Sequence, residues 1–505
     1  MNLPTEFNQL WTRRFVWLLA AVLIFRAVFM LFFCAHVDLA GDEAYYWDWG
    51  RVPDWGYYSK PPMIGWLMGT VGWLTGDSEW GIRALALLLG TGTLVLIFAL
   101  ARQLYSAKAA FMAVVLVLLT PASAGLNLFL TIDAPLLLTW SAALALFWAA
   151  VEKPHCWVRW LLLTLVIGLG TLSKQMMLVF PLLMVVFAFV SKADRVLLKN
   201  PRFWLSMIVG AAFLLPVLWW NEQHAWITLE HTKHHFDTKS VGFGKWLTRT
   251  LEWPGVQALV YTPVTWAALI YILLAGFRYW PQMARRERFL ILFSGPALIV
   301  FSLLALRQRI NPNWPAVFYV PAFILVGAWF TAHLPVQGFV TWKRWTLRVA
   351  GTVTLLLHLA LPVVFLTSLK GHPKLNALRG WEQVGQQMGQ YLNEVPRPQQ
   401  TQVLALGHRY HAAQLAFYMP QHPRLFRFEP LGHAMSQYEV WPGLEQHLGD
   451  DVLIMTDKPV PKAVSDCFER VEPFGKITLA DGDAGRVFEV FLGQKLNTWK
   501  KVGVR

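Results

Sequence analysis

Two adjacent carboxylates, Asp42 and Glu43, are the first residues in the chain that could perform acid–base chemistry. They directly follow a long apolar segment, where an acidic pair is costly unless it faces water and has a function. An aromatic run from Tyr45 to Tyr58 follows, which could stack a sugar or form a belt at the membrane interface. We interpret Asp42 as the catalytic base of a membrane-embedded transferase; the stretch alone also fits a solvated helix end.

Lys60 stands immediately before Pro61 and Pro62. Because proline fixes its own backbone and restricts the preceding residue, this lysine is held in a defined place. A rigidly held ammonium group outside the membrane suits a phosphate as a point charge. The alternative is a lysine that anchors the loop with its charged end in water.

Other polar residues stand at the ends of apolar segments. Asp133 opens one such segment, and an ionisable residue so near hydrocarbon indicates a function, although Asp is also a preferred helix cap. Lys174 lies between two apolar segments, and Arg307 and Arg309 follow another. An anionic lipid phosphate would explain these cations, and so would ordinary ion pairs with nearby carboxylates.

The composition is typical of a membrane protein. The chain has 505 residues, of which 56% are hydrophobic and 15% charged, and soluble domains have about a quarter charged residues. The 27 tryptophans favour membrane interfaces and sugar stacking. The net charge of +14 fits basic cytoplasmic loops better than nucleic-acid binding. The 3 cysteines lie far apart and indicate neither a metal site nor a disulfide framework.

A bilayer core needs about 20 apolar residues per helix, and about 11 segments approach this length. The first is too long for a signal peptide and lacks a cleavage site, so we expect it to remain as a span. The expected spans lie near residues 15–37, 81–101, 109–127, 130–151, 157–172, 175–191, 203–220, 256–277, 289–306, 314–333 and 346–367.

Basic and acidic residues alternate between successive loops, as the positive-inside rule requires when the N-terminus is cytoplasmic. An odd number of spans then places the C-terminal part in the periplasm of a Gram-negative cell. We therefore expect a multi-pass protein of the inner membrane with long outer loops at 38–80 and 221–255. The second loop contains His231, and such loops often carry binding and catalysis.

From about residue 370 the composition becomes that of a soluble protein. Helical patterns over 381–393 and 410–419 alternate with strand patterns over 402–406, 451–455 and 487–492, which predicts a small α/β domain over 370–505. We see no catalytic signature there, and His408 reads as a surface histidine more readily than as a ligand-binding one. The expected fold is an α-helical polytopic membrane module over 1–369 with this small periplasmic domain.

Taken in order, these motifs resemble the GT-C superfamily of polyprenyl-phosphate-sugar-dependent glycosyltransferases. Within it, the chain resembles the bacterial branch that contains the lipid A aminoarabinose transferase and the protein O-mannosyltransferases, with a span or two fewer than the aminoarabinose transferases. The likeness covers nearly the whole chain. It is carried by Asp42 and Glu43 and by the segments 58–62, 131–135, 168–174 and 313–316.

The resemblance implies an inverting sugar transfer at the outer face of the inner membrane, from an undecaprenyl-phosphate donor to lipid A or lipopolysaccharide. By analogy, Asp42 is the general base toward the acceptor hydroxyl, with Glu43 beside it. The implied donor-phosphate ligands are Lys60, Lys174, Arg307 and Arg309, and the implied positioning residues are Asp133, Tyr58, Asn313 and His231. No metal is obligatory for such a transfer, and the loop histidines leave a divalent metal open.

Other functions stay open at this point. A protein hydroxyl or another envelope glycan is the second choice of acceptor, and the sequence does not choose the sugar. A transporter or flippase of lipid-linked sugars would also have many spans and intramembrane charges. Transporters, however, tend to show broken helices at the midplane and paired repeats, whereas these charges gather at one face. A scaffold for envelope assembly would leave Asp42 dispensable.

Overall fold

The chain forms two compact units, each assembled from segments that are far apart in the sequence. The structure is a computed structural model that describes residues 5–234, 242–336, 339–366, 377–479 and 486–500. The first unit contains Met1–Phe29, Arg83–Leu215 and His234–Ala360, and the second contains Met30–Ile82, Pro216–Lys233 and Leu361–Arg505. The predicted outer loop 38–80 therefore groups with the C-terminal region.

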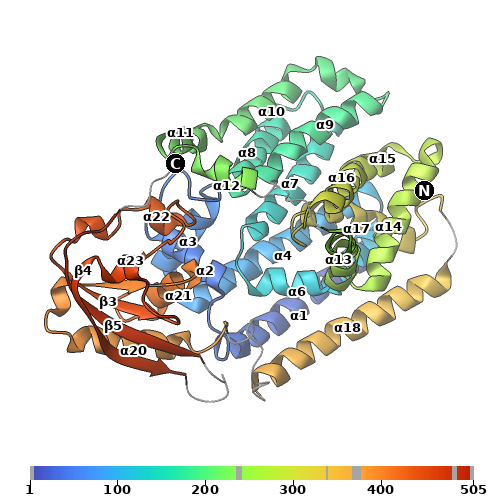
Figure 1. Cartoon of the computed structure of the whole chain (residues 1–505). Coiled ribbons are helices and arrows are strands. Elements are labelled where there is room, and N and C mark those ends of the chain that lie inside the picture. Colours follow the sequence, from blue (N-terminus) through green and yellow to red (C-terminus); the bar gives the residue numbers. More distant parts are fainter. Residues whose placement is uncertain (1–4, 235–241, 337–338, 367–376, 480–485, 501–505) are drawn as a thin grey trace. The chain divides into compact units, whose positions relative to one another are not determined.

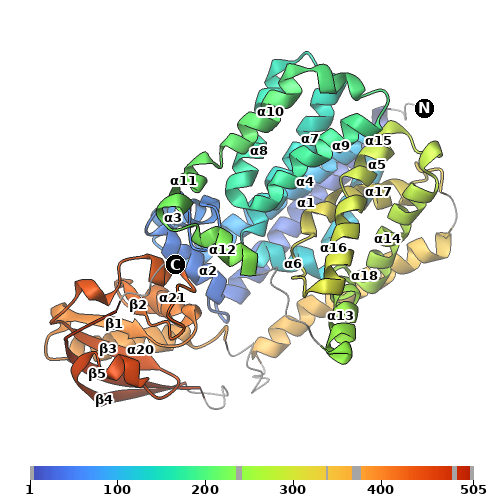
Figure 2. The ribbon, with the colours of Figure 1, turned by 45° about the horizontal axis from the view of Figure 1, so that its top comes forward.

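The regular elements among the described residues of the first unit are all helices (Figure 1). In Figures 1 and 2, α8 runs beside both α7 and α10. The helices are α1 (Thr5–Cys34, whose end lies in the second unit), α4 (Glu79–Leu104, whose start does), α5 (Ala107–Leu118), α6 (Pro121–Leu128), α7 (Asp133–Glu152), α8 (Trp157–Ser173), α9 (Val179–Val190), α10 (Pro201–Ala212), α13 (Phe243–Tyr261), α14 (Pro263–Arg278), α15 (Arg285–Leu292), α16 (Gly295–Arg307), α17 (Ala316–Phe330) and α18 (Val340–Leu366).

Within the described residues, 6 helices are long and apolar enough to cross a bilayer. The number rises to 8 if each of two bent pairs counts as one span: α5 with α6, bent by 74°, and α13 with α14, bent by 109°. The predicted spans near 157–172, 175–191 and 314–333 fall on apolar helices of 10–17 residues. The structure thus confirms a polytopic helical module, but the predicted count of about 11 spans is not confirmed.

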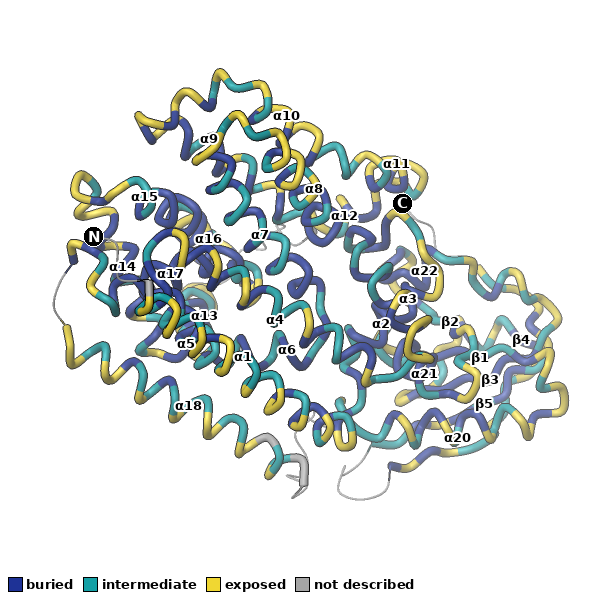
Figure 3. The backbone as a smooth tube through the Cα atoms, turned by 180° about the vertical axis from the view of Figure 1, so that it is seen from behind, coloured by how far each residue is buried: buried dark blue, intermediate teal, exposed yellow. Residues whose placement is uncertain are grey.

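Burial separates the helices of this unit into central and peripheral ones (Figure 3). Every residue of α17 from Val317 to Trp329 is buried. It approaches α5 so closely that a Cβ on Gly327 would lie 2.6 Å from the carbonyl oxygen of Ala109, so the contact needs a small residue. In α18 only 6% of the most apolar window is buried, and leucines such as Leu355 are exposed, as on a surface that faces lipid.

The second unit contains a five-stranded sheet in the order β2-β1-β3-β5-β4. Strand β1 pairs in parallel with β2 and β3, whereas β5 is antiparallel to both β3 and β4. Leu404 and Ile454 face each other in the β1–β3 register and are fully buried in the core. The strands are β1 (Thr401–Ala405), β2 (Leu425–Arg427), β3 (Asp451–Thr456), β4 (Phe468–Thr478) and β5 (Val487–Leu496).

Eight further α-helices belong to the described residues of this unit. They are α2 (Gly41–Gly50), α3 (Met63–Thr75), α11 (Leu215–Gln223), α12 (Ile227–His234), α20 (Trp381–Glu394), α21 (Arg409–Tyr418), α22 (Gln437–Val440) and α23 (Lys462–Ser465). Of these, α20, α21, α22 and α23 contact the sheet. Helix α2 lies between α3 and α21 (Figures 1 and 2). The predicted interfacial helix from Met63 is α3, but the predicted loop 221–255 is largely helical, since α12 and much of α13 fall within it.

Candidate functional site

The two first-loop carboxylates have different surroundings in the first turn of α2. Glu43 is fully buried, and its Oε2 accepts the backbone N–H of Ala40 at 3.0 Å, which caps the helix. Asp42 is only partly buried. Both benefit from the positive end of the helix dipole. Glu43 therefore secures the helix, and Asp42 is the carboxylate that a substrate could reach.

The partner of Asp42 is Tyr410, in the first turn of α21. The Tyr410 hydroxyl donates to Oδ1 of Asp42 at 2.9 Å. A Cβ on Gly41 would lie 2.2 Å from the Tyr410 ring, so this approach of α2 to the ring requires glycine. Burial, with the Asp42 charge second, raises the pKa of Tyr410 to about 12. The hydroxyl therefore keeps its proton at physiological pH and acts as a donor to the carboxylate.

A permanent positive charge adjoins this pair. The Arg409 guanidinium lies over the Tyr45 ring at 5.3 Å and over the Tyr410 ring at 5.1 Å. Burial lowers the pKa of Arg409, but Tyr45, Tyr410 and Asp42 raise it, and the net shift is upward. Its Nε is buried without a hydrogen bond. Sequence reasoning missed Arg409 and Tyr410, since no local pattern links residues of the last third of the chain to Asp42.

The Tyr58–Lys60 segment forms a tight turn in the same unit. The backbone N–H and C=O groups of Tyr57 and Lys60 pair at 3.1 and 3.3 Å, which holds the half-buried Lys60 at the end of the turn. The Tyr58 hydroxyl lies 3.2 Å from Nδ1 of His231, on α12. Tyr58 is only 4% exposed. The predicted positioning residues Tyr58 and His231 therefore meet each other.

Three other predicted residues meet in the helical unit. Nζ of Lys174, which follows α8, lies 2.8 Å from Oδ1 of Asp133. Nδ2 of Asn313, which precedes α17, donates to Oδ2 of Asp133 at 2.6 Å. Asp133 is 2% exposed and Lys174 8%. The carboxylate makes no cap for α7, because the N-cap is Ile132 and has no side-chain cap bond. Its role is to bind Lys174 and Asn313.

The predicted phosphate ligands Arg307 and Arg309 are exposed residues at the end of α16. Arg309 forms an ion pair with Glu252 of α13. Its side chain is 74% exposed, and a pair so open to water contributes little energy. The ion-pair alternative that the sequence left open thus describes both Arg309 and Lys174 in this structure.

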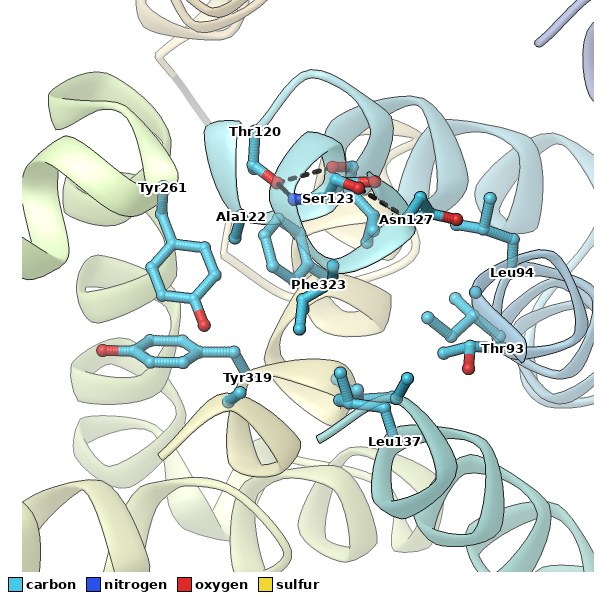
Figure 4. A pocket seen from close by; sticks show the side chains of 17 residues that line it. Thr93, Leu94, Thr120, Ala122, Ser123, Asn127, Leu137, Tyr261, Tyr319 and Phe323 are labelled. Carbon is cyan, nitrogen blue, oxygen red and sulfur yellow. Dashed lines mark hydrogen bonds between the residues drawn. The ribbon is translucent and has the colours of Figure 1, made fainter. Parts of the chain in front are cut away.

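An apolar pocket adjoins Asp133 in the helical unit (Figure 4). Ala134 and Leu137 of α7 line it, so the pocket begins one residue after the carboxylate. In Figure 4 the rings of Tyr261 and Tyr319 lie on one side of the pocket and Thr93 on the other. Such a wall of apolar and aromatic groups with few polar ones suits a lipid chain.

No cluster of three or more His, Cys, Asp or Glu that could hold a metal ion occurs among the residues that the structure describes. His235 of the predicted histidine-rich loop lies outside those residues. The metal that the sequence left open thus has no candidate site in the described part of the chain.

Comparisons with known proteins agree with this architecture. Residues 59–220 match the family described as dolichyl-phosphate-mannose-protein mannosyltransferase. The chain is 27% identical over 337 residues to the lipid A galacturonosyltransferase RgtD of Rhizobium johnstonii, across 66% of this chain and 68% of the relative. It superposes on ArnT from Cupriavidus metallidurans with a TM-score of 0.63 at 15% identity, covering 95% of this chain and 98% of ArnT. ArnT bound to undecaprenyl phosphate matches with the same TM-score at 14% identity.

These findings confirm the predicted resemblance to the GT-C superfamily. The fold is that of ArnT: a polytopic helical module with a small C-terminal α/β domain. The chain is a multi-pass inner-membrane protein. The comparisons also support the predicted enzyme class, a glycosyltransferase that uses a lipid-phosphate-linked sugar.

Proposed function

We propose that the chain is an inverting glycosyltransferase that moves a sugar from a polyprenyl-phosphate donor to lipid A at the outer face of the inner membrane. The observation that carries the proposal is the partly exposed Asp42 carboxylate at the start of α2, held by the Tyr410 hydroxyl at 2.9 Å. Its donor and acceptor are those of the similar proteins: RgtD is a lipid A transferase, and ArnT binds undecaprenyl phosphate.

Asp42 is the general base of the proposed reaction. It takes the proton of the acceptor hydroxyl as that oxygen bonds to the anomeric carbon of the donor sugar. The bond from this carbon to the phosphate oxygen breaks on the opposite side, so the configuration inverts and polyprenyl phosphate leaves. Tyr410 positions the carboxylate by donating to Oδ1. Arg409 adds a positive charge beside it, and Glu43 holds the helix turn.

The donor phosphate is bound by cations, because its leaving oxygen gains charge in the transition state. Lys60 and Lys174 are the two candidate phosphate ligands whose positions are fixed by the structure. The tight turn fixes Lys60, and the ion pair with Asp133 fixes Lys174. Asp133 and Asn313 position Lys174, while Tyr58 and His231 support the turn that carries Lys60. Arg307 and Arg309 act as exposed cations that attract the phosphate. The apolar pocket beside Asp133, with a volume of about 70 Å³, takes only the end of the isoprenoid chain next to the phosphate.

The proposed topology places the N-terminus in the cytoplasm and the α/β domain in the periplasm. The excess of Lys and Arg in alternate loops supports this orientation. It puts Asp42 and the α/β domain, which belong to one compact unit, on the side where lipid-linked sugars and lipid A would meet.

The test compares Asp42→Asn with wild type in a strain that lacks the native gene, by mass spectrometry of lipid A and of released glycans. Loss of a general base costs about 10²–10⁴-fold in rate, so the sugar-sized mass increment on lipid A should disappear. Asp466→Asn, at an exposed position of the α/β domain, is the matched control and should keep the increment.

Equal modification by the Asp42→Asn variant and wild type would overturn the base assignment and favour a transporter. An increment on proteins instead of lipid A would keep the enzyme class and change the acceptor, as the match to the protein mannosyltransferase family would then suggest. Immunodetection of the variant in the membrane fraction separates lost activity from lost protein.

A further inference from the structure

The second unit contains a cavity of about 560 Å³, lined mainly by the α/β domain, that the proposed reaction does not yet use. Its lining includes polar and aromatic groups from separate elements, a typical composition for a ligand site of this size. The residues that matter here are Trp381, His408, Tyr410, His411, Asp457 and Arg486.

The cavity lies where sheet topology favours ligand binding. His408 follows the carboxyl end of β1, and Asp457 follows the carboxyl end of the adjacent parallel strand β3. From β1 the chain continues through α21 to β2 on one side of the sheet, and from β3 it continues to β4 and β5 on the other. Neighbouring parallel strands whose connections diverge leave a crevice at their carboxyl ends, which is the usual ligand site of open α/β sheets.

The lining groups suit an anionic sugar. The Arg486 guanidinium lies over the Trp381 ring at 5.0 Å and donates to the carbonyl of Arg379 at 3.2 Å, so the charge is held at an aromatic wall. Burial lowers the pKa of His408 to about 4 and also lowers that of His411, so both imidazoles are neutral near pH 7 and can bind hydroxyls. The carboxylate of Asp457 is a further hydroxyl acceptor.

The same cavity reaches the proposed base. Tyr410 lines the cavity, and its hydroxyl donates to Asp42 at 2.9 Å. Gly41, the residue before Asp42, also lines it. A ligand bound here would therefore lie against the two residues that carry and orient the carboxylate.

We infer that this cavity binds the phosphorylated saccharide headgroup of the acceptor, with Arg486 on the phosphate and His411 and Asp457 on sugar hydroxyls. The inference rests on the proposed function for the identity of the acceptor. It assigns the α/β domain a part in acceptor recognition, while Lys60 and Lys174 stay the candidates for the donor phosphate.

Binding to the full-length protein in detergent tests the inference, with glucosamine 1-phosphate, glucosamine and inorganic phosphate as probes in isothermal titration calorimetry. Loss of one charge-assisted contact should weaken binding about 10–100-fold. Arg486→Gln should weaken both glucosamine 1-phosphate and phosphate. Asp457→Ala should weaken glucosamine 1-phosphate and glucosamine and leave phosphate binding unchanged. Arg470→Gln, an exposed arginine of β4, is the matched control and should bind like wild type.

Kinetics with intact lipid A supply the second readout. For Arg486→Gln we expect the acceptor KM to rise about 10-fold, with kcat and the donor KM unchanged. The inference would be overturned if wild type, Arg486→Gln and Asp457→Ala bound glucosamine 1-phosphate equally well. It would also be overturned if the wild-type protein bound phosphate but not glucosamine 1-phosphate. Wild-type protein that binds glucosamine 1-phosphate but transfers no sugar to lipid A would show that the proposed acceptor is wrong. The inferred phosphosugar site would still be supported.

Discussion

Replacing Lys174 by methionine removes one partner of the ion pair with Asp133 in the helical unit. The side chains of the two residues are 10% and 3% exposed, so water cannot replace the lost ammonium group easily. Removing one partner of a buried pair costs about 3–5 kcal/mol. Asn313 still donates to the other carboxylate oxygen at 2.6 Å, which places the expected loss near the lower limit, about 3 kcal/mol.

The double variant Asp133→Asn, Lys174→Met separates charge from packing. Without either charge, the cost falls to that of a lost hydrogen bond, about 1 kcal/mol. The double variant should therefore be more stable than Lys174→Met alone, and the coupling in the mutant cycle should exceed about 2 kcal/mol.

Equilibrium unfolding in detergent, followed by tryptophan fluorescence, measures these free energies. Arg309→Gln is the matched control, because its pair with Glu252 is exposed and should cost at most about 1 kcal/mol. A Lys174→Met protein as stable as wild type, or a double variant whose loss equals the sum of the single losses, would refute the reasoning.

Three further predictions concern the second unit and a glycine control. Tyr410→Phe removes the donor to Asp42 and should lower kcat/KM about 10–100-fold with unchanged circular dichroism. Gly41→Ala pushes a methyl into the Tyr410 ring and should cost about 1–3 kcal/mol, whereas Gly125→Ala, with open space around it, should be neutral or stabilising. The pKa of His408 is lowered by burial to about 4 from 6.5, so the unfolded chain binds the proton more readily and stability should fall as pH drops through this window. In thermal scans from pH 7.5 to 5, His408→Gln should lessen that fall, and an unchanged slope would contradict the prediction.

The positions of Asp133 and Lys174 in the sequence were sufficient to identify them as notable residues, whereas Asn313 was indicated by the family resemblance. Asp133 and Lys174 each stand at the end of an apolar segment, where a charge is costly without a partner. The mutual contact of the three residues required the structure, because they come from three separate helix ends. The contact of Tyr410 with Asp42 could not be predicted for a different reason. The Tyr410 segment has the pattern of an ordinary helix start, and it lies 368 residues from Asp42.

The number of spans could not be predicted from hydropathy, because hydropathy sums apolar residues and carries no information on where a helix bends. Between α13 and α14, Thr262 adopts a positive φ of 63° and Pro263 starts the next helix, which produces the 109° bend inside one apolar stretch. Strand β4 was also missed. Most of its residues are exposed or half-buried, with a register irregularity between Pro473 and Gly475, so it lacks the apolar alternation of an inner strand.

Helices α2 and α21 pack against each other, although the ribosome makes them at different times. Asp42 is made well before its partner Tyr410, which follows 368 residues later. At about 5–20 residues per second, the ribosome needs roughly 20–70 s to cover that distance. During this interval the helix with the proposed base has no α/β domain to pack against. A nascent chain can insert its spans in the bilayer, but the proposed base gains its partner only after Tyr410 has been made.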